Sequence, residues 1–136
     1  MKNRGAKTGN RGLVKVAMGA MTNAVADFSG FKVGAAILAG DGRIFTGCNI
    51  ENPSLMLTIC AERVALLKAL SEGATDFERI AISASKNPCY PCGSCRQMLF
   101  EFAKGIKVIT VNPKGSMKST GIDKLLPMTF RYKKGG

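Results

Sequence analysis

Three cysteines and one glutamate form the group of side chains in this sequence that could do chemistry. Cys60 and Glu62 lie two positions apart, and Cys92 and Cys95 follow directly after Pro91. Thiolates are preferred zinc ligands, and three protein ligands leave the fourth tetrahedral position open for water, as in catalytic zinc sites. A carboxylate beside the ion can take a proton from that water and deliver it to a ring nitrogen and then to a leaving amine. We therefore predict one zinc ion held by the three cysteines, with Glu62 as the proton carrier.

The three cysteines are expected where helices begin. Backbone N–H groups and the positive end of the helix dipole favour anions there and lower thiol pKa values. Three thiolates on one Zn²⁺ leave a net negative charge, and the sequence contains no histidine that could reduce it. Arg63 is our candidate for donating to a ligand thiolate and offsetting that charge, and Arg96 is a second choice.

Other metal chemistry fits part of this pattern. A Cys-x-x-Cys pair alone is more often structural or redox-active than catalytic. Cys89 lies three residues before Cys92, so an iron–sulfur or structural cluster could use Cys89 in place of Cys60. The presence of Glu62 beside Cys60, at the start of its own helix, favours the catalytic zinc site. Cys89 and Cys48 are then expected to be non-ligands, as a loop residue and a small buried residue.

The rest of the chain predicts the elements that must position this site. Apolar periodicity and stop signals predict helices over residues 12–27, 57–72 and 91–104, with a short helical turn at 122–126. Apolar runs between turn signals predict strands over residues 31–38, 43–50, 77–85, 107–111 and 116–120. Helices that alternate with strands after an initial hairpin indicate an α/β fold. We expect a three-layer α/β/α sandwich with a mixed sheet of about five strands.

The basic residues of the chain lie mainly at its two ends. The net charge is +11, yet residues 16–103 carry seven basic and eight acidic residues. We expect a single domain over residues 12–130, with a basic flexible arm at residues 1–11 and a basic tail at residues 131–136. A nucleic-acid-binding surface needs a basic stripe interleaved with aromatic residues, and tryptophan is absent. Nucleic acid is therefore not the expected partner, and a zinc-stabilised nucleic-acid-binding module is the alternative from another functional class.

Cysteine usage and hydropathy bear on the compartment. Five cysteines are an odd number, and three of them lie at metal-ligand spacing, which favours a reduced compartment over a disulfide framework. No apolar run reaches the roughly 18 residues that a membrane span needs. A basic start followed by Leu13 and Val14 loosely resembles an export signal, but Lys15, Thr22 and Asn23 interrupt its apolar part. We expect a cytoplasmic protein that has no membrane partner.

Five segments of the chain, in order, match the motifs of a known family: Phe31–Ala36, Gly47–Asn52, Cys60–Arg63, Pro91–Gln97 and Leu125–Phe130. Cys-x-Glu followed by Pro-Cys-x-x-Cys is the signature of zinc nucleobase deaminases in its three-cysteine form. With the other segments, it makes the chain resemble the small homotetrameric zinc cytidine deaminases over about residues 12–130. The blasticidin-S deaminases are near relatives of that family.

The resemblance implies a reaction and a role for each site residue. The reaction is hydrolytic deamination of cytidine and deoxycytidine to uridine and deoxyuridine with release of ammonia, as in pyrimidine salvage. The implied enzyme is a homotetramer with one Zn²⁺ per subunit, held by Cys60, Cys92 and Cys95, with Glu62 as the proton shuttle. The implied substrate contacts are Phe31 on the base, Asn49 and Glu51 on the ribose hydroxyls, the Ala61 backbone on the polar edge of the base, and Phe130 from a neighbouring subunit.

Each of these substrate contacts also has a purely structural interpretation. Phe31 and Phe130 could simply pack in a core, and Asn49 and Glu51 could serve the turn before Pro53.

The chain also departs from the family at two segments. Pro53-Ser54-Leu55 stands where family members carry Ala-x-Tyr, and Val25–Ser29 replaces Tyr-Ala-Pro-Tyr-Ser. Leu55 and Phe28 thereby lack a hydroxyl group that could contact a substrate or a neighbouring subunit. A modified or antibiotic cytosine nucleoside such as blasticidin S is therefore the alternative substrate.

Overall fold

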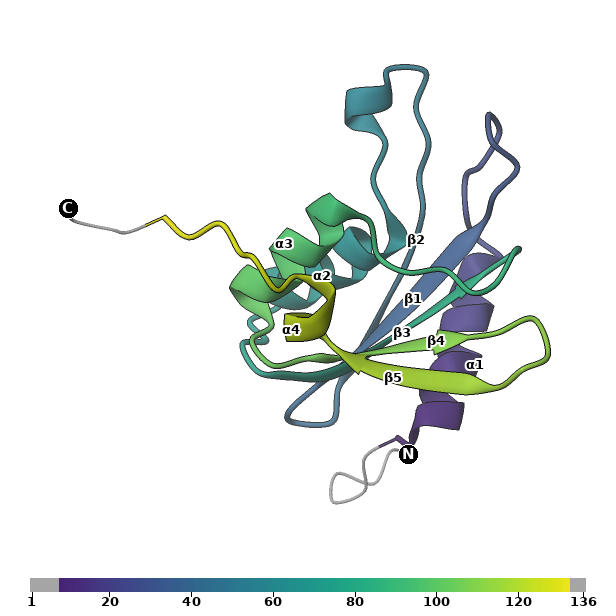
Figure 1. Ribbon diagram of the computed structural model, residues 1–136. Coiled ribbons are helices and arrows are strands. Elements are labelled where there is room, and N and C mark those ends of the chain that lie inside the picture. Colours follow the sequence, from purple (N-terminus) through teal and green to yellow (C-terminus); the bar gives the residue numbers. More distant parts are fainter. Residues whose placement is uncertain (1–7, 133–136) are drawn as a thin grey trace.

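The computed structural model describes residues 8–132 of the 136-residue chain. Its centre is a five-stranded sheet in the order β2-β1-β3-β4-β5, shown in Figure 1. The strands are β1 (Val33–Ala39), β2 (Ile44–Cys48), β3 (Phe77–Ala84), β4 (Lys107–Val111) and β5 (Met117–Gly121). β3 and β4 run parallel, whereas the other neighbouring strands run antiparallel. The mixed sheet that the sequence predicts is confirmed.

Helices cover both faces of this sheet. α1 (Asn10–Met21) packs on one face, and α2 (Ala61–Ser71) and α3 (Gly93–Phe102) pack on the other, as Figure 1 shows. A short helix, α4 (Ile122–Leu125), follows β5. All seven residues of β1 are buried, because a central strand with helices on both faces has no face in water. The arrangement is the expected three-layer sandwich.

Two glycines allow the helices to approach the sheet closely. A Cβ atom on Gly34 of β1 would lie 2.1 Å from the carbonyl oxygen of Ala17 in α1. A Cβ atom on Gly47 of β2 would lie 2.4 Å from the carbonyl oxygen of Ala61 and 2.5 Å from the backbone nitrogen of Ala65, both in α2. These backbones can come so near only where the strand residue has no side chain. Gly47 thus sets the position of the start of α2.

Helix α3 is two residues shorter at each end than the predicted range 91–104, and three boundaries of α1 and α2 also differ from the prediction. α1 begins at Asn10, two residues before the expected start at residue 12. Arg79 of β3 donates to Asn10 Oδ1 and to the Thr8 carbonyl, which ties the start of α1 to the sheet. The rest of the expected arm, residues 1–7, and the end of the expected tail, residues 133–136, lie outside the described residues.

The other two differences concern loops beside the site. α1 ends at Met21 rather than near residue 27, because Val25 pairs with the backbone of Asn49 and Glu51 instead of continuing the helix. α2 begins at Ala61 rather than at Leu57. The apolar segment before it forms η1, a 3₁₀ helix (Leu55–Leu57), on a hairpin that projects from the body in Figure 1. Among residues 8–132, no helix has the length and apolar character needed to cross a membrane.

Candidate active site

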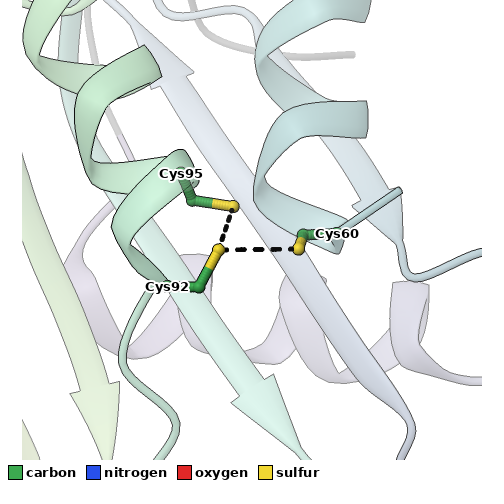
Figure 2. A group of neighbouring side chains, drawn as sticks. All are labelled: Cys60, Cys92 and Cys95. Atoms are coloured by element: carbon green, nitrogen blue, oxygen red, sulfur yellow. Dashed lines mark hydrogen bonds between the residues drawn. The ribbon is translucent and has the colours of Figure 1, made fainter. Parts of the chain in front are cut away.

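The sulfur atoms of Cys60, Cys92 and Cys95 converge between the starts of α2 and α3, as Figure 2 shows. Cys60 is the N-cap of α2 and Cys92 is the N-cap of α3, and Cys95 lies in the first turn of α3. The Sγ atoms of Cys60 and Cys92 are 3.8 Å apart, and those of Cys92 and Cys95 are 3.5 Å apart. All three lie within 4.8 Å of one another. The predicted three-cysteine cluster is therefore formed.

This spacing fits a zinc ion. Zinc–sulfur bonds of about 2.3 Å in a tetrahedron place two sulfurs about 3.8 Å apart, which agrees with the two distances above. Cys60, rather than Cys89, completes the group: the Cys89 thiol lies outside it and donates to the Tyr90 carbonyl at 3.9 Å. The iron–sulfur alternative that used Cys89 in place of Cys60 is not supported by this geometry.

Arg63 lies against the cluster. Its Nη2 is 3.7 Å from the Cys60 sulfur and donates to the Thr58 carbonyl at 3.3 Å. A hydrogen bond from the Cys95 thiol and the contact with Arg63 lower the pKa of Cys60 to about 5, against the opposing effect of burial. Donating that proton raises the pKa of Cys95. The Arg63 guanidinium therefore lies where it stabilises a thiolate at Cys60.

Arg96, the second choice for this role, has other partners. Its Nε donates to the Pro91 carbonyl at 2.7 Å, and its Nη1 donates to the Leu125 carbonyl at 2.8 Å. These bonds join the loop before α3 to α4. Arg96 therefore supports the backbone that carries Cys92, whereas the contact with a sulfur is made by Arg63.

Glu62 is buried directly beside the cluster. It lies in the first turn of α2, next to Cys60, and is only 4% exposed. Burial raises the pKa of Glu62 to about 7, with a further contribution from the negative charge on Cys60. Glu62 lines a cavity of about 170 Å³ together with Cys60 and Cys92. A carboxyl that titrates near neutral pH beside a metal-ligand cluster is typical of an acid–base catalyst.

The same cavity contains several of the predicted substrate contacts. Phe31, Asn49 and Ala61 line it. The Asn49 side chain is buried; its Nδ2 donates to the Phe31 carbonyl at 2.8 Å, and its Oδ1 accepts from the Val33 backbone N–H at 2.9 Å. These bonds place Phe31 at the cavity wall. Phe31 lines this cavity and is also partly buried against the apolar core.

Glu51 lies in a neighbouring hollow of about 330 Å³, which is lined by Phe28, Ser29, Asn52, Leu55 and Thr58 as well. One carboxylate oxygen of Glu51 accepts from the backbone N–H groups of Phe28 and Ser29, each at 3.0 Å. Its other oxygen accepts from the Ser29 hydroxyl. The Ser29 hydroxyl and these backbone bonds lower the pKa of Glu51. Thr58 lines both hollows, so Glu51 lies beside the cavity of Glu62 rather than within it.

Phe130 is not brought to the site of its own chain. It is 71% exposed on the segment that leaves the body after α4, and Figure 1 shows this segment extending away from the sheet. Gln97 Nε2 donates to the Phe130 carbonyl at 3.1 Å, so its backbone is anchored to α3 while its ring faces outward. The core-packing interpretation of Phe130 is wrong for the isolated chain.

Sequence reasoning missed three residues of the site region. Ser29 contacts Glu51, Thr58 accepts from Arg63 and lines both hollows, and Cys89 lines the cavity. Burial raises the pKa of Cys89 to about 11, so it stays a neutral thiol there. The separation of Ser29 from Glu51 by 22 positions leaves no local pattern that could reveal their contact.

Comparisons with known proteins agree with this geometry. Residues 8–112 match the model of the cytidine and deoxycytidylate deaminase zinc-binding region. A cytidine deaminase from Sporosarcina psychrophila is 46% identical over 113 residues, which cover 82% of this chain and 83% of that protein. One from Halalkalibacterium halodurans is 45% identical over 120 residues, which cover 87% and 91% respectively.

The fold also resembles that of a solved structure. The cytidine deaminase of Burkholderia pseudomallei matches with a TM-score of 0.86 and 40% sequence identity, covering 90% of this chain and 100% of that one. Three observations lead to the same assignment: the five-stranded mixed sheet, the three-cysteine cluster and the sequence match over most of the chain. The chain belongs to the cytidine and deoxycytidylate deaminase family that shares this zinc-binding region.

Proposed function

We propose that this chain catalyses hydrolytic deamination of cytidine and deoxycytidine to the uridine nucleosides with release of ammonia. One observation carries the proposal: the buried Glu62 lines the same cavity as Cys60 and Cys92. In the reaction a water oxygen bonds to C4 of the base and the bond from C4 to its amine breaks. That exchange needs an activated water and a group that carries protons, and both requirements can be met at this cavity.

Cys60, Cys92 and Cys95 would hold one zinc ion per subunit. When bound, zinc supplies Lewis acidity that lowers the pKa of a water molecule and so provides a nucleophile near neutral pH. The three sulfurs come from two helix starts, where backbone N–H groups favour thiolates over thiols. Arg63 offsets part of the negative charge of the three thiolates through its contact with Cys60.

Glu62 moves the protons. Its carboxylate accepts a proton from the attacking water and gives it to N3 of the base, and it carries a second proton to the departing amine. Burial raises the pKa of Glu62, which suits a group that must accept and return protons in one turnover. Burial keeps bulk water from taking over that exchange.

The remaining site residues hold the nucleoside. Phe31 packs on the base, the Ala61 backbone contacts its polar edge, and Asn49 and Glu51 bind the ribose hydroxyls. The first three line the cavity of Glu62 and the last lies in the adjoining hollow, which supports a substrate that spans the two. The Asn49 amide still has one N–H and one lone pair beyond its two backbone bonds.

We further propose that residues 12–130 form one catalytic domain between the basic ends 1–11 and 131–136, and that the enzyme is a cytoplasmic homotetramer. Phe130 would then complete the active site of a neighbouring subunit. An assembly is supported by large apolar side chains that are exposed in the described part of the chain: Leu55, Met56, Leu57, Phe28, Met128, Phe130 and Tyr132. Five free cysteines fit a reduced compartment.

The test is ammonia release from a panel of cytosine nucleosides. Cytidine and deoxycytidine should give ammonia and the uridine nucleosides, and incubation with a zinc chelator should abolish both. Cytosine-containing oligonucleotides should not react. Salt-sensitive RNA binding without ammonia release from any nucleoside would instead favour the nucleic-acid-binding module.

A second candidate substrate is a modified or antibiotic cytosine nucleoside such as blasticidin S. The observation that favours it is the hollow beside Glu51, where Leu55 and Phe28, both without the hydroxyl usual in the family, provide apolar walls. These walls make no hydrogen bond to an unmodified sugar, and the hollow of about 330 Å³ has room for a sugar that carries an additional substituent. Preference for blasticidin S over cytidine in kcat/KM would support this candidate and displace the first.

A further inference from the structure

The Ser29 hydroxyl lies between two residues of the substrate site. It donates to Oε2 of Glu51, and it accepts from the backbone N–H of Phe31 at 2.9 Å. The directions follow from the groups themselves, because an ionised carboxylate can only accept and an N–H can only donate. The Ser29 hydroxyl therefore bonds to two residues. One is Glu51, whose carboxylate is expected at the ribose, and the other is Phe31, whose ring is expected at the base.

The bonds around Ser29 form a continuous chain. Glu51 is held at one end by the backbone N–H groups of Phe28 and Ser29 as well as by the hydroxyl. Phe31 is held on both sides, by Ser29 at its N–H and by Asn49 at its carbonyl. Asn49 in turn accepts from Val33, the first residue of β1. These hydrogen bonds thus link Glu51 to the beginning of the central strand β1.

We propose that Ser29 is a positioning residue that fixes the spacing between Glu51 and Phe31, and so couples recognition of the ribose to packing of the base. The inference rests on the proposed deamination of cytosine nucleosides. A carboxylate has about four lone-pair sites, and three are used by Phe28 and Ser29. The remaining capacity of Glu51 accepts from a hydroxyl of the substrate, in a direction that Ser29 determines.

A purely local role for Ser29 makes a different prediction. A hydroxyl that accepts from the N–H two residues later is a common turn motif, and removing it would loosen the loop for every substrate alike. The positioning role concerns Glu51 specifically, so its loss should be felt most by substrates that have ribose hydroxyls. The two roles are therefore separated by comparing cytidine with 2′,3′-dideoxycytidine.

The experiment measures kcat and KM of wild type, Ser29→Ala and Ser29→Thr with both substrates, and Ser119→Ala on an exposed position of β5 is the matched control. Ser29→Ala should lower kcat/KM for cytidine by about ten-fold, mainly through KM, and for 2′,3′-dideoxycytidine by about three-fold or less. Ser29→Thr keeps the hydroxyl and should restore most of the loss. Ser119→Ala should change neither ratio.

Equal losses for the two substrates, or no loss for cytidine, would overturn the proposal. Calorimetry of uridine and 2′,3′-dideoxyuridine binding tests the same selectivity for ribose hydroxyls without turnover. Ser29→Ala should weaken the binding of uridine more than that of 2′,3′-dideoxyuridine. Absence of ammonia release by the wild type would contradict the proposed function, whereas a selective change in uridine binding would still support the role of Ser29. Zinc content should be the same in all variants.

Discussion

The Nη2 atom of Arg63 lies 3.7 Å from the sulfur of Cys60, while the Nε atom of the same guanidinium is buried and has no hydrogen-bond partner among residues 8–132. A buried donor without an acceptor destabilises the fold. Electrostatic attraction to the cysteine cluster compensates for it, and the contact with Cys60 raises the pKa of Arg63. The thiolates therefore stabilise the buried guanidinium of Arg63, and Arg63 in turn stabilises the thiolates.

Arg63→Gln should weaken zinc binding by about 10- to 100-fold, as loss of an outer partner of a metal ligand typically does. The glutamine lacks the positive charge that favours three thiolates around one ion. Arg63→Lys keeps the charge and should recover part of the affinity. Competition with a chromogenic chelator measures the dissociation constant, and Arg43→Gln, at the exposed ion pair with Asp41, is the control. Unchanged zinc affinity in Arg63→Gln would refute the charge-balancing role.

Glu62→Gln should lower kcat for cytidine by at least about 10³-fold, because the amide can neither accept nor return the protons of the reaction. It keeps the size of the side chain, so zinc content and the unfolding temperature should stay near those of the wild type. Exposed Glu101→Gln on α3 serves as the control and should retain full activity. A Glu62→Gln variant that deaminates cytidine at the wild-type rate would show that another group carries the protons.

The raised pKa of Glu62 also predicts how stability depends on pH. The pKa rises from 4.5 to about 7 on folding, so the folded chain binds this proton more tightly than the unfolded chain does. The stabilisation is complete below pH 4.5 and is lost as the pH rises to about 7. The shift corresponds to about 3 kcal/mol. Because Cys60 shifts in the opposite direction, the effect must be read from a comparison with Glu62→Gln.

We expect the difference in unfolding free energy between the metal-free wild type and metal-free Glu62→Gln to change by about 3 kcal/mol between pH 4.5 and pH 7, with the wild type losing stability as the pH rises. The intrinsic Cys60 contribution is present in both proteins, whereas the repulsion between Cys60 and Glu62 is lost with the substitution and is part of the measured difference. Urea unfolding under reducing conditions, after treatment with a chelator, provides the measurement. A difference that is constant across this range would mean that Glu62 titrates at an ordinary carboxyl pKa in the folded chain.

The metal cluster was predictable from sequence because its parts are local. Cys60 and Cys92 are each the N-cap of a helix, and the residues that follow them indicate where that helix begins. Cys92 and Cys95 are about one helical turn apart. The sheet was predictable for a similar reason: turn residues separate four largely apolar strands, and the fifth strand follows the turn at residues 112–115. Joining the two motifs in space rested on their combined chemistry, three thiolates and one carboxylate, because nothing local relates Cys60 to Cys92.

The loops beside the site were not predictable in the same way. Val25, expected in a helix, pairs with the segment at Asn49 and Glu51, and that choice depends on backbone groups more than 20 positions away. Leu55 and Met56, 85% and 93% exposed, lie in the apolar lead just before the helix expected to begin at Leu57, and no element among residues 8–132 covers them. Pattern analysis assumes that apolar residues are buried against other parts of the same chain. These two side chains of the hairpin are exposed instead.

Gly47→Ala should destabilise the fold by about 3 kcal/mol and also impair zinc binding. The added Cβ atom would lie 2.4 Å from the Ala61 carbonyl oxygen and 2.5 Å from the Ala65 nitrogen. These are backbone atoms, so β2 and the start of α2 must separate, and overpacking of this kind typically destabilises by about 1–3 kcal/mol or more. Cys60 and Glu62 would move with the helix.

Gly19→Ala is the matched control, because nothing lies within 4 Å of a Cβ atom at Gly19 in α1. Alanine is the better helix former there and should stabilise the chain by about 0.5–1 kcal/mol. Urea unfolding gives both free energies, and chelator competition gives the zinc affinities. A Gly47→Ala variant with wild-type stability and zinc affinity would mean that the start of α2 can shift without moving Cys60. In that case the close approach of β2 to α2 would not determine the position of the metal ligands.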